Sequence, residues 1–190
     1  MKIVLFLLDG VGDNQNPDLG NKTPLQYAKI PTMDKIAKTG INGLHDPVQS
    51  GLACGSDTAH MSIFGNNPLD LYNGRGAFEA LGSGLDMKPE YDIAFKSNFA
   101  FLNEETNIVE RRRVDREFPQ WGLELVDVVD SVVIPGYEKY KVSCKYATEH
   151  RVGIKISGPG LSQNITGQDP LKDNKPLPKV EPTIKNDKKA

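Results

Sequence analysis

"KIVLFLLDGVGD", residues 2–13, decides the fold class. Residues 3–8 form a continuous apolar run rich in strand-forming side chains, and Asp9 follows it directly. A short run without polar alternation is typical of a strand that is buried on both faces, as in a parallel sheet covered by helices. Ligands of open α/β sheets bind beyond the carboxyl ends of the strands. The stretch therefore predicts an α/β fold with a candidate site at Asp9.

The composition limits the classes of protein to which this chain can belong. Its 190 residues suffice for one domain with an inserted subdomain, and 38% hydrophobic and 25% charged residues are typical of a folded chain. A net charge of −2 disfavours a dedicated nucleic-acid binder. The apolar run is too short to span a membrane and precedes no signal cleavage site. The two cysteines, Cys54 and Cys144, show no metal-binding spacing. We therefore expect a cytoplasmic protein without membrane or nucleic-acid partners.

The chain shows two different patterns in succession. Up to residue 87, helix starts are expected at residues 23–24 and 31–32, helices over 56–64 and 74–84, and a second strand over 41–46. From residue 88, alternating apolar and polar residues predict a hairpin of 92–102 with 107–113, a helix over 117–133, and a second strand pair of 139–147 with 150–157. We therefore expect the N-terminal part of an α/β core (1–87), an inserted α+β subdomain (88–176) and a Pro- and Lys-rich linker (177–190) that contains one short strand.

"GLACGSDTAHMSIFG", residues 51–65, carries the candidate nucleophile. Ser56 opens the predicted helix, where the helix dipole and free backbone N–H groups stabilise an alkoxide or a bound phosphate. A serine hydroxyl needs a base or a metal to activate it, and Asp9 could share a divalent cation with its oxygen. The alternatives are that Ser56 only caps the helix, worth about 1 kcal/mol, and that Asp9 is a turn residue. The local sequence leaves both alternatives open.

Other polar residues leave two interpretations each. His60, one turn after Ser56, either lines the site or has a structural role, and Arg75 either binds an anion or packs its stem. The arginines at 111–113 alternate in direction if they lie on a strand, so at most two of them face one way. Their alternative is a solvated edge strand, because charge protects edges from association.

Several longer motifs occur in one order and at one spacing. They are "LFLLDGVGD" (5–13), "NKTPLQYAKIPTMDKIAKTG" (21–40), "CGSDTAHMSIFG" (54–65), "NGRGAFEALGSG" (73–84), "IVERRR" (108–113) and "HRVGIKISGPGLSQNITGQDP" (150–170). With these motifs the chain resembles the N-terminal portion of the archaeal-type 2,3-bisphosphoglycerate-independent phosphoglycerate mutases, which belong to the alkaline phosphatase superfamily. The resemblance extends to about Val180.

The resemblance implies an activity and a set of site residues. It implies interconversion of 3-phosphoglycerate and 2-phosphoglycerate in glycolysis and gluconeogenesis, through a phosphoserine at a site with two divalent ions (Mn²⁺, Mg²⁺ or Zn²⁺). The phosphorylated serine falls on Ser56, and the first metal-binding aspartate falls on Asp9, with Ser56 as a second ligand of that metal. The inserted subdomain resembles a substrate-holding lid whose contact residues would be Arg111, Arg112, Arg113, Arg151 and Asp169.

The chain also departs from the family pattern. A two-metal site needs further Asp and His ligands, and the three histidines, at 45, 60 and 150, form no such cluster in the sequence. Smaller departures fall at Arg113–Arg116, Ser157 and Gly167, in the substrate-contact region. We therefore expect an incomplete core that needs a complementary C-terminal chain. The alternatives are a related metal-dependent phosphohydrolase or phosphomutase, or a truncated domain that binds phosphorylated ligands without turnover.

Overall fold

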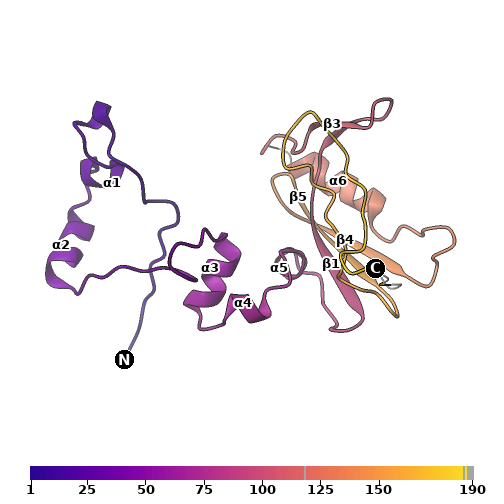
Figure 1. The fold of residues 1–190 in the computed structure, drawn as a ribbon, viewed down its shortest axis with the longest axis horizontal. Helices are drawn as coiled ribbons and strands as arrows, with labels where there is room; N and C mark the ends of the chain where they lie inside the picture. Colours follow the sequence, from indigo (N-terminus) through magenta and orange to yellow (C-terminus); the bar gives the residue numbers. More distant parts are fainter. Residues whose placement is uncertain (118, 186, 188–190) are drawn as a thin grey trace. The chain divides into compact units, whose positions relative to one another are not determined.

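The structure is a computed structural model that describes residues 1–117, 119–185 and 187. It separates into two compact units, Met1–Tyr72 (unit 1) and Asn73–Ala190 (unit 2), and each is described by itself. Unit 1 contains a 3₁₀ turn, η1 (Pro17–Leu19), and the short helices α1 (Pro24–Tyr27), α2 (Pro31–Thr39), α3 (Ser56–Ile63) and α4 (Pro68–Leu71). Figure 1 shows that irregular segments join these helices.

The helices of unit 1 begin where local sequence signals place them. Before α1, the Thr23 hydroxyl accepts a hydrogen bond from the Gln26 backbone N–H at 3.1 Å, and the Gln26 side chain accepts one from the Thr23 N–H at 2.9 Å. This reciprocal capping satisfies two donors that a helix start leaves unpaired. Pro31 occupies the first position of α2 and Gly40 ends that helix, its N–H donating to the Ile36 carbonyl. The expected helix starts are confirmed.

The two strands expected in unit 1 do not form. Residues 2–8 and 41–46 lie outside any strand, and the apolar side chains of Ile3 and Phe6 are 83% and 86% exposed. A buried strand needs hydrogen-bonded neighbours at both of its edges, and none of the residues described in unit 1 lies in a strand of the named sheets. The prediction of a buried strand over residues 3–8 is therefore wrong for this chain by itself.

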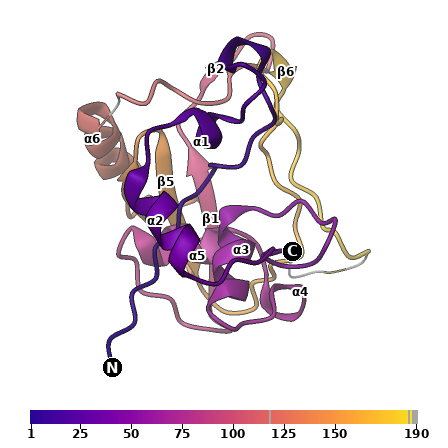
Figure 2. The ribbon, with the colours of Figure 1, turned by 90° about the vertical axis from the view of Figure 1, so that its left-hand side faces the viewer.

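Unit 2 holds both sheets. Its elements are α5 (Gly76–Gly82), β1 (Asp92–Asn98), β2 (Phe101–Asn103), β3 (Ile108–Arg111), α6 (Pro119–Val129), β4 (Lys141–Thr148), β5 (Arg151–Ser157) and β6 (Lys175–Pro176). One antiparallel sheet has the order β1-β5-β4 and the other the order β2-β3-β6. Figure 2 shows β2 and β6 together at one end of this unit.

The first sheet carries a helix on each face. Successive residues of a strand point to opposite faces, and Val152 of β5 belongs to the apolar cluster that contains Val126 of α6. The next residue, Gly153, faces α5: a Cβ there would lie 2.6 Å from the Ser83 hydroxyl and 3.1 Å from the Ala80 Cα. Glycine is therefore what lets α5 approach the sheet, while α6 covers the face that holds the core (Figure 1).

Strand pairing in unit 2 follows the sequence in part. The hairpin of β2 with β3 and the pair of β4 with β5 are confirmed, whereas β1 pairs along its whole length with β5. The expected strand near residue 180 is reduced to an isolated bridge between Ile165 and Pro182. Residues 118, 186 and 188–190, which belong to the expected helix and linker, lie outside the described residues.

The loop after α5 is tied to the first sheet. The Lys145 ammonium donates to the Gly84 carbonyl at 2.9 Å, and the Lys155 ammonium donates to the Asp86 carbonyl at 2.7 Å. These contacts hold residues 84–86 within unit 2. The predicted division of the whole core at residue 87 stays a prediction.

Candidate active site

Ser56 and Asp9 face each other in unit 1. The Ser56 hydroxyl donates a hydrogen bond to the Asp9 Oδ2 at 3.3 Å, across 47 positions of sequence, and both residues are exposed. Gly55 is the N-cap residue of α3 and makes no side-chain cap, so Ser56 is the first residue of the helix. The interpretation of Ser56 as a helix cap is therefore wrong. The side chains of Ser56 and Asp9 lie next to each other, as expected.

The next polar residues of α3 bond to structural partners. The His60 Nδ1 lies 2.5 Å from the Ser56 carbonyl oxygen, one turn back along the helix. The Tyr72 hydroxyl donates to the Asp57 carboxylate and so ties the start of α3 to the residue that follows α4. The contact of His60 favours its structural interpretation.

A metal site would be only partly built from these residues. Asp9 and Ser56 offer two oxygen atoms of the kind that Mg²⁺, Mn²⁺ or Zn²⁺ accepts, whereas zinc takes four ligands and magnesium about six. Among the residues that the structure describes, no three His, Cys, Asp or Glu side chains gather to hold a metal. The described residues therefore do not fit a metal on their own.

Positive charges gather in unit 2. Lys96 lies in the middle of β1 with a half-buried side chain. Burial lowers the pKa of Lys96, and the positive charge of Arg75 lowers it next; Glu79 raises it, and Arg113 and Arg151 lower it further. Cations that disfavour the charged form of a neighbouring lysine also attract an anion to that part of the surface. We call Arg75, Lys96, Arg113 and Arg151 the basic cluster.

The structure divides the predicted substrate-contact residues into two groups. Arg113 and Arg151 belong to the basic cluster, whereas Arg111 bonds to the Asp115 carboxylate at 2.5 Å and stacks 5.5 Å from the centre of the Phe101 ring. Sequence reasoning missed Lys96, although a single lysine among the apolar residues of an alternating strand was a usable signal.

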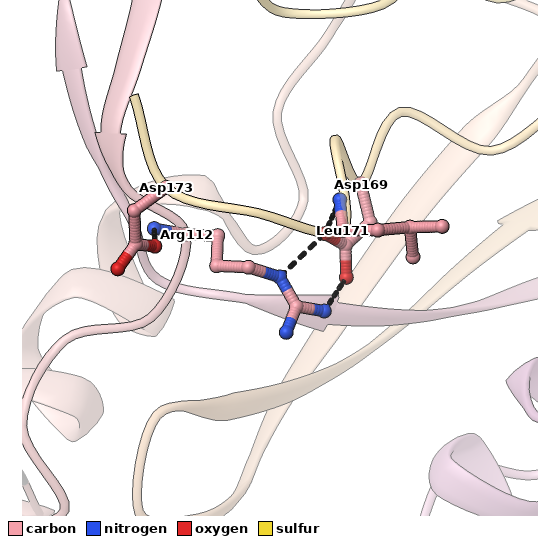
Figure 3. A network of polar contacts seen from close by, with 4 residues as sticks. All are labelled: Arg112, Asp169, Leu171 and Asp173. Atoms are coloured by element: carbon pink, nitrogen blue, oxygen red, sulfur yellow. Dashed lines mark hydrogen bonds and ion pairs between the residues drawn. The ribbon is translucent and has the colours of Figure 1, made fainter. Parts of the chain in front are cut away.

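Arg112 and Asp169 bond to each other (Figure 3). The Arg112 Nε donates to the Asp169 Oδ1 at 2.8 Å, and its Nη2 donates to the other carboxylate oxygen. The Arg112 backbone N–H donates to Asp173 at 2.9 Å, and the Leu171 N–H donates to Asp169 at 2.9 Å. The hydrogen bond from Arg112 is the first cause that holds the pKa of Asp169 below its usual value. This network fastens the loop at residues 169–173 to the end of β3.

The two units define a mixed α/β protein with open sheets, a partial fold of the alkaline phosphatase type. Over residues 37–190 the chain matches the model of the family described as 2,3-bisphosphoglycerate-independent phosphoglycerate mutase, and it belongs to that family. Similar curated proteins carry the same name: 40% identity over 180 residues in Methanothermobacter thermautotrophicus and 43% over 181 residues in Thermoplasma acidophilum, each covering 95% of this chain.

Two solved structures are similar to this chain. The cofactor-independent phosphoglycerate mutase of Thermoplasma acidophilum matches 94% of this chain with a TM-score of 0.53 and 38% identity, using 46% of its own length. A protein of Pyrococcus horikoshii matches 78% of this chain with a TM-score of 0.59, using 35% of its own length. The chain spans 43% of the length of the two curated relatives. Among the described residues, no helix has the length and apolar character needed to cross a bilayer.

Proposed function

We propose that this chain is the nucleophile-carrying part of a phosphoglycerate mutase that interconverts 3-phosphoglycerate and 2-phosphoglycerate in the cytoplasm. The observation that carries the proposal is the 3.3 Å hydrogen bond between Ser56 and Asp9 in a chain of the mutase family. It brings a hydroxyl and a carboxylate together at the start of an eight-residue helix. A serine nucleophile needs a neighbouring base or a metal to activate it, and Asp9 is a neighbouring acceptor.

Ser56 accepts the phosphoryl group in this proposal. Its oxygen attacks phosphorus while its proton passes to the Asp9 carboxylate, and the bond from phosphorus to the glycerate oxygen breaks as that oxygen takes up a proton. The phosphoryl group later returns to the other glycerate hydroxyl, which gives up its proton. Asp9 accepts the hydrogen bond that orients the serine oxygen, and the N–H groups at the start of α3 stabilise the negative charge of the bound phosphate.

The basic cluster is the proposed binding site for the substrate anion. Phosphoglycerate carries a carboxylate and a phosphate, and both bind well to arginine, which donates two parallel hydrogen bonds. The repulsion that Arg75, Arg113 and Arg151 exert on Lys96 supports this role, because an anion relieves it. The other predicted contact residues have structural roles in this proposal. Arg112 bonds to Asp169, and Arg111 bonds to Asp115.

The rest of the metal site is proposed to come from a C-terminal polypeptide. The curated relatives extend well beyond the matched region, and residues 3–8 expose a row of apolar side chains with strand composition. We propose that strands of this C-terminal region pair with residues 3–8 and bring Asp and His ligands to Asp9 and Ser56. When bound there, a divalent ion such as Mn²⁺, Mg²⁺ or Zn²⁺ would supply charge stabilisation.

Completing the enzyme tests the proposed activity. The chain is joined to the C-terminal region of the Thermoplasma acidophilum mutase and supplied with 3-phosphoglycerate and each divalent ion in turn. We expect 2-phosphoglycerate as the product, with the label of [³²P]3-phosphoglycerate retained in it. Release of labelled inorganic phosphate in place of 2-phosphoglycerate would assign a phosphohydrolase. A completed chain that binds the substrate without turnover would contradict both activities.

A further inference from the structure

One buried titratable group beside the basic cluster has no part in the proposed chemistry. His150 follows Glu149 in the tight turn that connects β4 to β5, and Glu149 has a φ of 53°. The residue is 7% exposed, and its carbonyl oxygen accepts a hydrogen bond from the Phe99 N–H at 2.8 Å. Its Nδ1 is buried and has no hydrogen-bond partner among the described residues. An unpaired ring nitrogen in a buried position costs free energy, so it calls for an explanation.

Charged groups from several segments act electrostatically on this imidazole. Arg113 follows β3, Arg151 opens β5 and Lys96 lies on β1, whereas Glu149 precedes His150 in the turn. Burial is the first cause that lowers the pKa of His150 below its ordinary value, and the charge of Arg113 is the second; Glu149 opposes them. The neutral imidazole is therefore favoured at neutral pH, because burial and three cations of the basic cluster disfavour its protonation.

Glu149, the acid that acts on His150, is shared between two guanidinium groups. One Glu149 carboxylate oxygen lies 3.9 Å from the Arg151 guanidinium, and the other lies 3.9 Å from the guanidinium of Arg116. It therefore cannot neutralise the cations around His150 by itself. A bound anion would reverse their effect, because a doubly charged anion beside the cluster cancels the charges that oppose protonation.

We propose that His150 is a positioning residue that takes up one proton from solvent when the basic cluster binds a doubly charged anion. The proton goes to a ring lone pair, no bond to the ligand forms, and the imidazolium adds one positive charge behind the cluster. An ordinary core histidine would keep its protonation state on binding. The proposal rests on the substrate site described above, and it makes anion binding stronger at low pH.

The direction of this pH dependence follows from linkage. The anion-bound form keeps its proton to higher pH than the free form, so affinity is highest below the pKa of the free form. Affinity then falls as pH rises to the pKa of the bound form, by at most about tenfold per pH unit for one proton. Sulfate is the probe of choice because it stays doubly charged throughout, whereas a phosphate monoester itself titrates near pH ~6.

Among the three histidines of the chain, His45 provides an internal control. The ¹⁵N-labelled 190-residue protein is titrated by NMR with and without sulfate, and then with 3-phosphoglycerate, while the imidazoles of His45, His60 and His150 are followed separately. We expect sulfate to raise the pKa of His150, with His45 as the control. His60 is not a control, because its ring contacts Ser56, where the phosphate is proposed to bind. If sulfate shifts the amide signals of the basic cluster while the pKa of His150 stays constant, the proposal is overturned and the binding site stands.

A charge variant tests the coupling without a ligand. Lys96→Gln removes one cation beside His150 and is expected to raise the pKa of the imidazole. Lys141→Gln is the matched control, because Lys141 is exposed at the opposite end of β4 from the turn and should leave that pKa unchanged. Equal pKa values in Lys96→Gln and the parent protein would overturn the proposal. If neither anion binds, while Lys96→Gln does raise the pKa, the substrate site and the proton uptake fall together and only the charge coupling remains.

Discussion

Unit 1 and unit 2 differ in what they bury. The buried hydrophobic residues that the structure describes include Val109, Val126, Val142 and Val152, all in unit 2. Unit 1 exposes most of the apolar residues of its N-terminal run, and Pro68 is its one buried residue among those described. The unit with a core carries the proposed anion site, whereas the unit without a core carries the Ser56–Asp9 pair.

The difference separates local from non-local determinants of structure. The helices of unit 1 form because caps and prolines act within a few residues of chain. A strand such as the expected one over residues 3–8 depends on partners that are distant in sequence. In unit 2 those partners are present, since β1, β4 and β5 pair with one another. Unit 1 thus has strand composition over residues 3–8 without strand partners among the residues that the structure describes.

Replacing the proposed nucleophile should give the largest effect and would break the assignment of chemistry to unit 1. In the completed enzyme, Ser56→Ala is expected to lower kcat by about 10³-fold or more and to abolish phosphoryl labelling of the protein, because no other oxygen takes its place. Ser62→Ala, on the same helix, is the matched control and should keep most activity. Labelled Ser56→Ala protein would contradict the phosphoserine proposal.

A methyl group at Gly76 tests how tightly α5 packs in unit 2. The added Cβ would lie 1.9 Å from the Ala94 carbonyl oxygen of β1, so the backbone must shift. We expect Gly76→Ala to lower the free energy of unfolding by about 3 kcal/mol, measured by urea denaturation. Gly82→Ala, at the end of the same helix, meets no atom within 4 Å and should cost less than about 1 kcal/mol. Equal losses in the two variants would show that α5 does not pack as described.

Truncating one valine in each unit sharpens the comparison directly. Val152 is 3% exposed in the core of unit 2, and Val4 is 75% exposed in unit 1. Val152→Ala should destabilise the chain by about 2 kcal/mol, while Val4→Ala should change its stability by less than about 0.5 kcal/mol. After completion with the C-terminal region, Val4→Ala should become costly as well. A large cost of Val4→Ala in the isolated chain would contradict the exposed state of residues 3–8.

Sequence reasoning succeeded where the determinants were near in sequence. It placed the start of α3 at Ser56 and the pairing of β4 with β5, because helix signals and alternation are local. It also placed Asp9 beside Ser56, but by resemblance, since 47 positions separate them. It could not foresee that β1 pairs with β5, because paired residues such as Asp92 and Ser157 are distant in sequence.

The basic residues show the same limit. The run of arginines at 111–113 drew attention, yet Arg112 bonds to Asp169 and Arg111 to Asp115, since acids 57 and 4 positions away lie within reach. Lys96 joins the basic cluster from another strand. Strand register determines which basic side chains form ion pairs with acids and which lie beside other basic side chains. Register depends on segments that are distant in sequence, so no single segment predicts it.

The smallest expected effect concerns the Arg112–Asp169 pair, whose side chains are 20% and 37% exposed. Because the pKa of Asp169 lies below its ordinary value of 3.8, the pair stabilises the fold fully above that value and loses its contribution as pH falls through the lowered pKa. We expect Asp169→Asn to lower the free energy of unfolding at pH 7 by about 1 kcal/mol, after allowing for solvent screening.

The same variant should approach the parent protein in stability as the pH is lowered past the pKa of Asp169, as urea denaturation over a series of pH values would show. Asp115→Asn is the control, because its pair with Arg111 is 76% and 48% exposed and should contribute less than about 0.5 kcal/mol. The Arg112 side chain donates two hydrogen bonds to one carboxylate and is largely shielded from solvent. For this reason we expect its pair to contribute more to stability than the Arg111–Asp115 pair. Equal losses for Asp169→Asn and Asp115→Asn would mean that the loop at residues 169–173 is held by something other than this pair.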